Sequence, residues 1–327
     1  MKIFLKIIAF TILTTNLFSQ SLSLYLENDF IGGYDKHYTN GFAIAYVNNT
    51  NDEDVKITNN KLYDFLYKVP TFYGDMKYSN SGLVFSHLTF TPHDISKKEK
   101  ITNDLPYAGV ATFDFFVQKW NEKILHQYML TLGLVGPSTY AKQLQKEMHS
   151  IFGNNDPKGW DNQLKDDFIY NAAYSLSTKP YTKDIGSKKF DITNTYKIDL
   201  GNYYRAIQVG SKIRISKNFA NNFNTIGRLI GINENLITNY ASFKNKKFAW
   251  ALSYGLSYSY IDYFYINDYD KSYNNQKIKN VFTHIISAET IWKKYILSVT
   301  AKISNTSLNN DHPIKNNWAG LNITYLF

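Results

Sequence analysis

The feature that most restricts the fold is a two-residue alternation through residues 250–260. Small or hydroxyl-bearing side chains occupy one parity of this segment, and large apolar or aromatic side chains occupy the other. Successive side chains of a β-strand point to opposite faces, so the segment predicts a long strand with one apolar and one polar face. The large residues are Trp250, Leu252, Tyr254, Leu256, Tyr258 and Tyr260.

The same alternation returns in residues 297–304 and 319–327. The polar residues that alternate with the aromatic ones also explain the composition. The mean hydropathy is −0.35 although the chain has 27 Tyr and 22 Phe. No stretch after the first 19 residues has the 18 continuous apolar residues that a transmembrane helix needs. If the chain spans a membrane, it must therefore do so as a closed β-barrel, whose wall alternates between lipid and a polar lumen.

Twelve candidate strands follow from this pattern, an even number as single-chain bacterial barrels require. We predict an all-β fold, a transmembrane antiparallel β-barrel of about twelve strands with a short helix in an extracellular loop. The candidate strands lie near residues 22–30, 39–48, 82–91, 108–119, 126–136, 167–178, 187–198, 204–216, 247–262, 279–292, 294–305 and 317–327.

The first 19 residues are typical of an export signal. Lys2 and Lys6 precede an apolar run that is too short to span a bilayer, and small and polar residues follow it. We predict a cleaved signal peptide over 1–19 and a barrel over 20–327; an uncleaved anchor is the alternative. The terminal residue Phe327 resembles the insertion signal of bacterial outer-membrane proteins. Together these features predict that the protein lies in the bacterial outer membrane, where the lipid bilayer is its partner.

The formal net charge is +9, and the chain has no Cys. The absence of Cys excludes disulfides, a thiolate zinc site and a Cys nucleophile. A positive surface favours anionic lipid or the phosphates of lipopolysaccharide. No compact Lys/Arg block is present, so a nucleic-acid partner is not expected. We expect a monomer.

Residues 138–152 depart from the strand pattern. They follow a Gly136–Pro137 breaker, Ser138 is a candidate cap, and Gly153 is placed to end a helix. Leu144, Met148 and Ile151 recur at helical spacing, while Gln145 and His149, four residues apart, would share one face.

Polar residues gather where the first two predicted strands meet. Asn28 and Asp29 end the first strand, and residues 35–41 enter the second. Hard oxygen donors at one rim are suited to Ca²⁺, although a solvated polar hairpin would look the same. The parity of the first strand places Asn28 on the lipid-facing side and Glu27 and Asp29 on the inner side, unless a β-bulge reverses it.

His149 is the best candidate for a general base, because imidazole titrates near neutral pH. The alternative is a merely structural histidine on a helix. The other histidines lie in strands or loops without a comparable setting: His37, His87, His93, His126, His284 and His312. Ser138 does not stand in a GxSxG turn, so the sequence gives little support to a serine nucleophile.

Six motifs in order resemble the signature of the lipid A 3′-O-deacylase family. They cover roughly residues 26 to 170, about half of the chain, and the rest matches only as alternating strands. The motifs are Leu26–Phe30, Tyr38–Gly41, Thr91–Ile95, Asn103–Gly109, Gly136–Ser138 with Gln145-xxx-His149, and Gly159–Leu164.

The resemblance implies a barrel whose active site lies between its outer wall and a short loop helix. It implies that His149 activates water and that Ca²⁺ near Asn28 and Asp29 polarises the ester of lipid A. Thr39 matches an active-site hydroxyl residue of the family. Gln145 and Asp161 match motif positions with either a catalytic or a helix-supporting role, and Asp156 is a candidate for an acidic partner.

Two other functions fit a barrel of this kind. One is a passive porin or adhesin with merely solvated rim residues. The other is an outer-membrane phospholipase, with the same chemistry on a different lipid.

Overall fold

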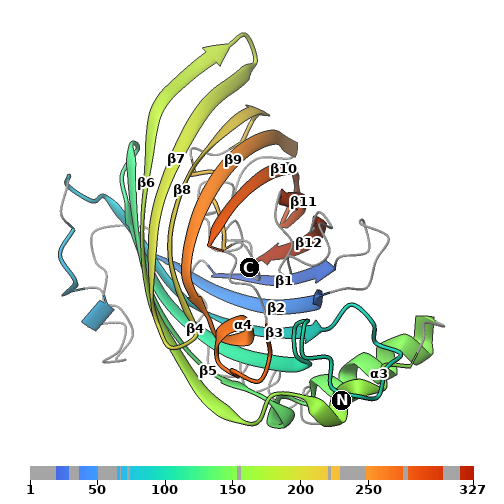
Figure 1. Ribbon diagram of the computed structural model, residues 1–327. Helices are drawn as coiled ribbons and strands as arrows, with labels where there is room; N and C mark the ends of the chain where they lie inside the picture. The colour runs from blue at the N-terminus through green and yellow to red at the C-terminus, as the bar shows by residue number, and fades with distance from the viewer. Residues whose placement is uncertain are drawn as a thin grey trace.

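A closed barrel of twelve antiparallel strands forms the protein (Figure 1). The computed structural model describes residues 20–28, 37–50, 65–66, 68–71, 74–152, 156–219, 222–228, 248–274, 279–304 and 317–327. The strands are β1 (Gln20–Asn28), β2 (His37–Thr50), β3 (Tyr78–Thr91), β4 (Ala108–Trp120), β5 (Ile124–Val135), β6 (Asp167–Ile185), β7 (Lys188–Gly201), β8 (Tyr204–Lys217), β9 (Phe248–Phe264), β10 (Asn280–Trp292), β11 (Tyr295–Ser304) and β12 (Asn317–Leu326).

Each strand pairs with its neighbours in sequence, and β1 pairs with β12 to close the sheet. The alternation sorts side chains as expected: Leu252 and Leu256 of β9 are exposed on the outer wall, whereas Ser253 and Ser257 are buried in the lumen. None of the helices among the described residues has the length and apolarity to cross a bilayer. The predicted signal peptide, residues 1–19, lies outside the described residues.

All twelve predicted strands are confirmed, and the largest difference in length is at β6. This strand continues seven residues beyond the predicted end at Thr178 and through Pro180, and it forms a hairpin with β7 that extends past its neighbours (Figure 1). Proline lacks a backbone N–H and interrupts a ladder, and the pairing register shifts here, between Thr178 and Tyr181. The shift lets the strand resume pairing with β7 after the proline.

The lumen is occupied by the segment 222–228, which inward-facing side chains of several strands hold. Arg228 lies 3.7 Å from the carboxylate of Asp114 on β4 and 3.4 Å from that of Asp199 on β7. Lys302 on β11 donates to the backbone carbonyl of Arg228 at 3.1 Å and to Glu27 of β1 at 3.3 Å. These contacts cross-link opposite parts of the wall.

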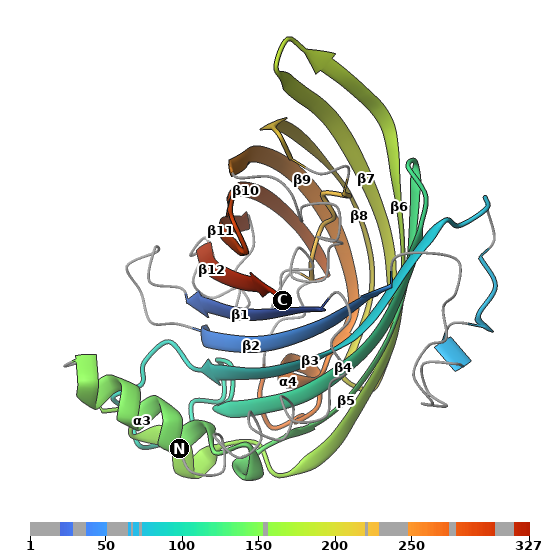
Figure 2. The ribbon, with the colours of Figure 1, turned by 180° about the vertical axis from the view of Figure 1, so that it is seen from behind.

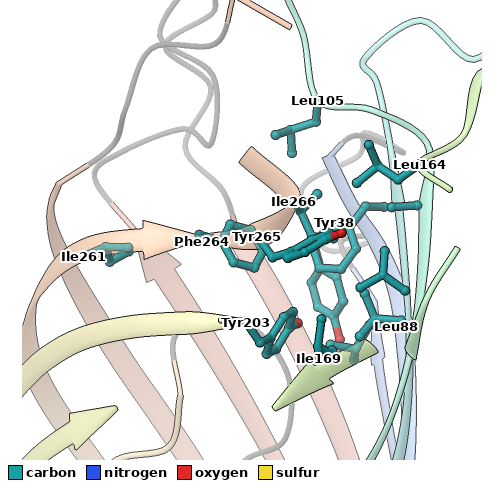
Figure 3. Close-up of a cluster of buried hydrophobic side chains, with 14 of the residues drawn as sticks. Tyr38, Leu88, Leu105, Leu164, Ile169, Tyr203, Ile261, Phe264, Tyr265 and Ile266 are labelled. Carbon is teal, nitrogen blue, oxygen red and sulfur yellow. The ribbon is translucent and has the colours of Figure 1, made fainter. Parts of the chain in front are cut away.

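A second group of buried side chains closes the lumen at the end where β1, β3 and β5 terminate. It combines residues from strands and loops far apart in sequence, and Figure 3 shows Tyr38, Phe264 and Tyr265 near its centre. α4 (Tyr265–Asp268) contributes Tyr265 and Ile266. The group labelled in the figure is Tyr38, Leu88, Leu105, Leu164, Ile169, Tyr203, Ile261, Phe264, Tyr265 and Ile266.

Arg228→Gln is expected to lower the free energy of unfolding by about 2–3 kcal/mol, because it leaves buried carboxylates without their ion pair. Urea unfolding in detergent micelles measures this change. The control is Arg205→Gln, which breaks an exposed pair with Asp262 (2.9 Å) and is expected to cost less than about 1 kcal/mol. Equal effects of the two substitutions would contradict the stabilising role of the lumen segment.

Candidate active site

The loop between β5 and β6 carries the predicted helix. It contains a 3₁₀ turn, η2 (Pro137–Thr139), the helix α3 (Ala141–Phe152) and a second 3₁₀ turn, η3 (Gly159–Asn162). The helix is confirmed, but the expected cap at Ser138 is wrong. Ser138 lies in η2 and donates through its backbone N and its Oγ to Asp166, both at 2.8 Å. Tyr140 then takes a left-handed conformation (φ 60°), so α3 begins one residue later. Gly153 lies outside the described residues.

α3 lies outside the barrel, against the ends of β3 and β4 (Figures 1 and 2). Its buried positions are Ala141, Gln145 and His149, spaced four residues apart and therefore on one side of the helix. Gly109 of β4 makes the close approach possible, because a Cβ there would overlap Thr139 and Ala141. The two polar side chains, Gln145 (0% exposed) and His149 (5%), thus face the wall instead of water.

The outer wall beside the helix is unusually polar. Outward-facing residues of a barrel normally contact lipid, yet His87, Thr89 and Thr91 of β3 are buried. His87 Nε2 donates to the backbone carbonyl of Thr139 at 3.0 Å. The β5–β6 loop therefore covers this part of the outer wall.

Thr39 belongs to the same face because β2 has a bulge. The register of β2 against β3 shifts between Tyr38 and Asn40, and the extra residue is Thr39. Its hydroxyl is 2.8 Å from that of Thr91 on the outer wall, whereas Tyr38 lies in the lumen and donates to Glu27. The bulge therefore places two successive side chains, Thr39 and Asn40, on the outer side, and Thr39 is buried there.

The first strand ends at this rim. Asn28 is exposed and pairs across the ladder with Asn40 of β2, while Glu27 is buried on the inner side. The parity predicted for Asn28 and Glu27 is confirmed. Asp29 lies outside the described residues.

Gln145 is held by a buried tryptophan. Trp160 in η3 is fully buried against Tyr107, and its Nε1 donates to Gln145 Oε1 at 2.7 Å. That bond fixes which end of the amide is the oxygen. The amide nitrogen Nε2, also buried, has no hydrogen-bond partner among the described residues. The Gln145 amide nitrogen is therefore an oriented N–H donor, buried where α3 faces the outer wall.

The two acidic candidates lie at the surface. Asp161 accepts a hydrogen bond from Lys142 at 2.7 Å, and Asp156 is 3.4 Å from Lys146. The hydrogen bond and the charge of Lys142 lower the pKa of the Asp161 carboxyl, so it stays ionised. Both contacts tie α3 to the loop that follows it.

Comparison with known proteins identifies the family of this chain. A family model described as outer membrane protein LpxR matches residues 4–327. The chain belongs to the LpxR family. The resemblance seen in the ordered motifs is thereby confirmed, and the protein is an outer-membrane β-barrel as predicted. No curated protein matched.

The fold also resembles that of a solved member of the LpxR family. LpxR from Salmonella typhimurium superimposes with a TM-score of 0.72 at 15% identity, covering 94% of this chain and 100% of that one. The β domain of the Bordetella autotransporter BrkA (TM-score 0.43, 8% identity, 94% and 98% covered) and an outer membrane channel from Pseudomonas putida F1 (0.43, 10%, 96% and 97%) are less similar.

The Ca²⁺ site expected from the sequence would lie at the rim where β1 and β2 meet. The described residues contain no group of three His, Cys, Asp or Glu placed to hold a metal. Asn28 and Asn40, however, form a ladder pair at the rim and carry amide oxygens, a ligand type that Ca²⁺ accepts. Asp29, next in the chain, would add a carboxylate.

Sequence reasoning missed two residues of the site, His87 and Trp160. His87 is 5% exposed and stacks on Phe42, and its Nδ1 has no hydrogen-bond partner among the described residues. A signal was present: His87 has the parity of the outward-facing Phe85, where a strand in contact with lipid would carry an apolar residue.

Proposed function

We propose that this protein is a hydrolase that removes the 3′-linked acyloxyacyl chain of lipid A in the outer leaflet. The observation that carries the proposal is the pair Gln145 and His149, buried between α3 and the outer wall. A site on the outside of a barrel is open to a substrate that stays in the membrane. The LpxR family and the six ordered motifs support lipid A as that substrate.

His149 is the proposed general base. It would take a proton from a water molecule as that water attacks the ester carbonyl, without a covalent acyl-enzyme. Gln145 Nε2, oriented by Trp160, would donate to the developing oxyanion. Thr39, buried on the same face of the wall, would supply a hydroxyl to position the substrate.

Ca²⁺ is part of the proposal, and Asn28 and Asp29 would hold it. When bound, the ion would polarise the ester carbonyl and stabilise the negative charge that develops on its oxygen. We further propose that the barrel acts as a monomer from the cell surface, with α3 in an extracellular loop.

Mass spectrometry of lipid A from cells with and without the protein tests the function. Loss of the 3′ acyl chains is the expected result, and an unchanged spectrum in calcium-replete cells would contradict it. Release of lysophospholipid instead would favour a phospholipase. The lumen contacts of Arg228 weigh against a passive pore.

Trp160→Phe is expected to lower kcat about five- to tenfold with little change in KM, because the ring still packs but no longer orients the Gln145 amide. Steady-state hydrolysis of purified lipid A in mixed micelles measures both constants. The control is Trp120→Phe at the other end of β4, also buried, which should leave both constants unchanged. An unaltered kcat in Trp160→Phe would exclude this role for the tryptophan.

A further inference from the structure

The exposed surface of α3 has two different flanks. On a helix that turns about 100° per residue, Lys142 and Lys146 fall on one side of the buried stripe, and Leu144, Met148 and Ile151 fall on the other. The polar residues Gln143, Glu147 and Ser150 lie between the two flanks. We call Leu144, Met148 and Ile151 the apolar flank.

The lysine flank shows which way the helix is turned. Lys142 contacts Asp161 and Lys146 contacts Asp156, both in the loop that follows α3. That loop packs on residues 95–98, beyond the strand ends: Lys158 N donates to Ile95 O at 2.9 Å, and Asn162 donates to Lys98 O at 2.7 Å. The lysine flank therefore faces away from the middle of the barrel.

The apolar flank faces the opposite way, toward the middle of the barrel wall, because it lies roughly 170° around the helix axis from the lysine flank. Two of its three residues are exposed, Met148 at 39% and Ile151 at 72%, and Leu144 is half-buried. A contiguous apolar patch on a surface marks a site of contact with a protein partner or a membrane.

The lipid-facing belt of the barrel begins on the strands beside the start of α3. On β4 the outward face runs from Gly109, where α3 begins, through Ala111 to Phe113, which is exposed. Phe113 packs on Phe85 of β3, with ring centroids 5.1 Å apart. The outward-facing Leu134 and Phe168 extend the exposed apolar surface on β5 and β6.

We propose that the apolar flank of α3 is immersed in the outer leaflet and contacts the acyl chains of its lipids. The helix then lies at the membrane interface, with its lysine flank toward the polar headgroups, as expected for an interfacial amphipathic helix. Continuity with the belt identifies the occupant as lipid and not as a second protein copy. The inference depends on the barrel lying in the outer membrane and not on the proposed hydrolysis.

The absence of Cys in the natural chain allows a direct test. A nitroxide label is placed on the full-length protein at Ile151→Cys or, in a separate variant, at Met148→Cys, and the protein is reconstituted in vesicles that contain lipopolysaccharide. Gln143→Cys on the polar side of the same helix is the aqueous reference, and Leu256→Cys on β9 is the lipid reference. All but Met148 are well exposed, so the label displaces no buried contact there.

Collisions with oxygen, which partitions into lipid, are compared with collisions with a water-soluble nickel chelate. The oxygen-to-nickel ratio at 151 and 148 is expected to be several-fold above that at 143 and close to that at 256. A ratio at 151 equal to that at 143 would overturn the proposal, and so would exclusion of both reagents, the result expected for a protein partner. Because the readout does not use hydrolysis, an inactive protein gives the same answer.

Discussion

His149→Ala is expected to lower kcat by about 10²–10⁴, the usual contribution of general acid–base catalysis. The helix presents this imidazole to the wall, where it is 5% exposed, and Gln145 is the other polar side chain of its buried stripe. The lipid A mass spectrum of cells that express wild type or the variant gives the readout, and purified protein gives the rate.

Gln143→Ala on the exposed side of α3 is the matched control and should retain activity. The oxygen-to-nickel ratio at residue 151 in the His149→Ala background shows whether the helix keeps its place. Full activity of His149→Ala would contradict the mechanism. His87, the buried histidine of the outer wall beside α3, would then be the base to test.

Removal of divalent cations with a chelator is expected to stop hydrolysis, and Ca²⁺ is expected to restore it better than Mg²⁺, which demands a stricter octahedral geometry. Asn28→Ala should raise the Ca²⁺ concentration needed for half-maximal rate, because it removes one oxygen donor at the rim. Activity measured against free Ca²⁺ in buffered solutions gives this value.

Asn48→Ala is the control for the calcium experiment. Asn48 lies on β2 with the same parity as Asn40, but at the opposite end of the strand, where it pairs with Gln20. Its Ca²⁺ dependence should match that of wild type. Undiminished hydrolysis in the presence of chelator would rule out the metal, even if His149→Ala is inactive.

The strands were predictable because each one carries its own signal. Alternation such as that of residues 250–260 follows from a wall with lipid on one side and polar atoms on the other, and no distant contact is needed to read it. The place of Asn28 on the outer face could be read for the same reason. Bounds were less predictable where a bulge intervenes, as at Pro180 in β6.

The site was harder to predict because α3 changes the surroundings of residues far away in sequence. The role of Trp160 depends on a contact with Gln145, fifteen residues earlier, and the burial of His87 depends on a loop more than fifty residues later. Ser138 shows the reverse case: its sequence context suited a cap, but Asp166 offered two hydrogen bonds instead.

The inner and outer faces of β3 have different roles, and their residues alternate along the strand. Leu88 and Phe90 help to close the lumen, whereas His87, Thr89 and Thr91 line the wall beside α3. A one-residue insertion or deletion in the middle of this strand would exchange the two sets, because a slip of one residue turns every side chain to the other face. Natural variation in β3 is therefore expected to replace residues freely at some positions but to keep its length fixed, since a single frame of pairing maintains both the fold and the site.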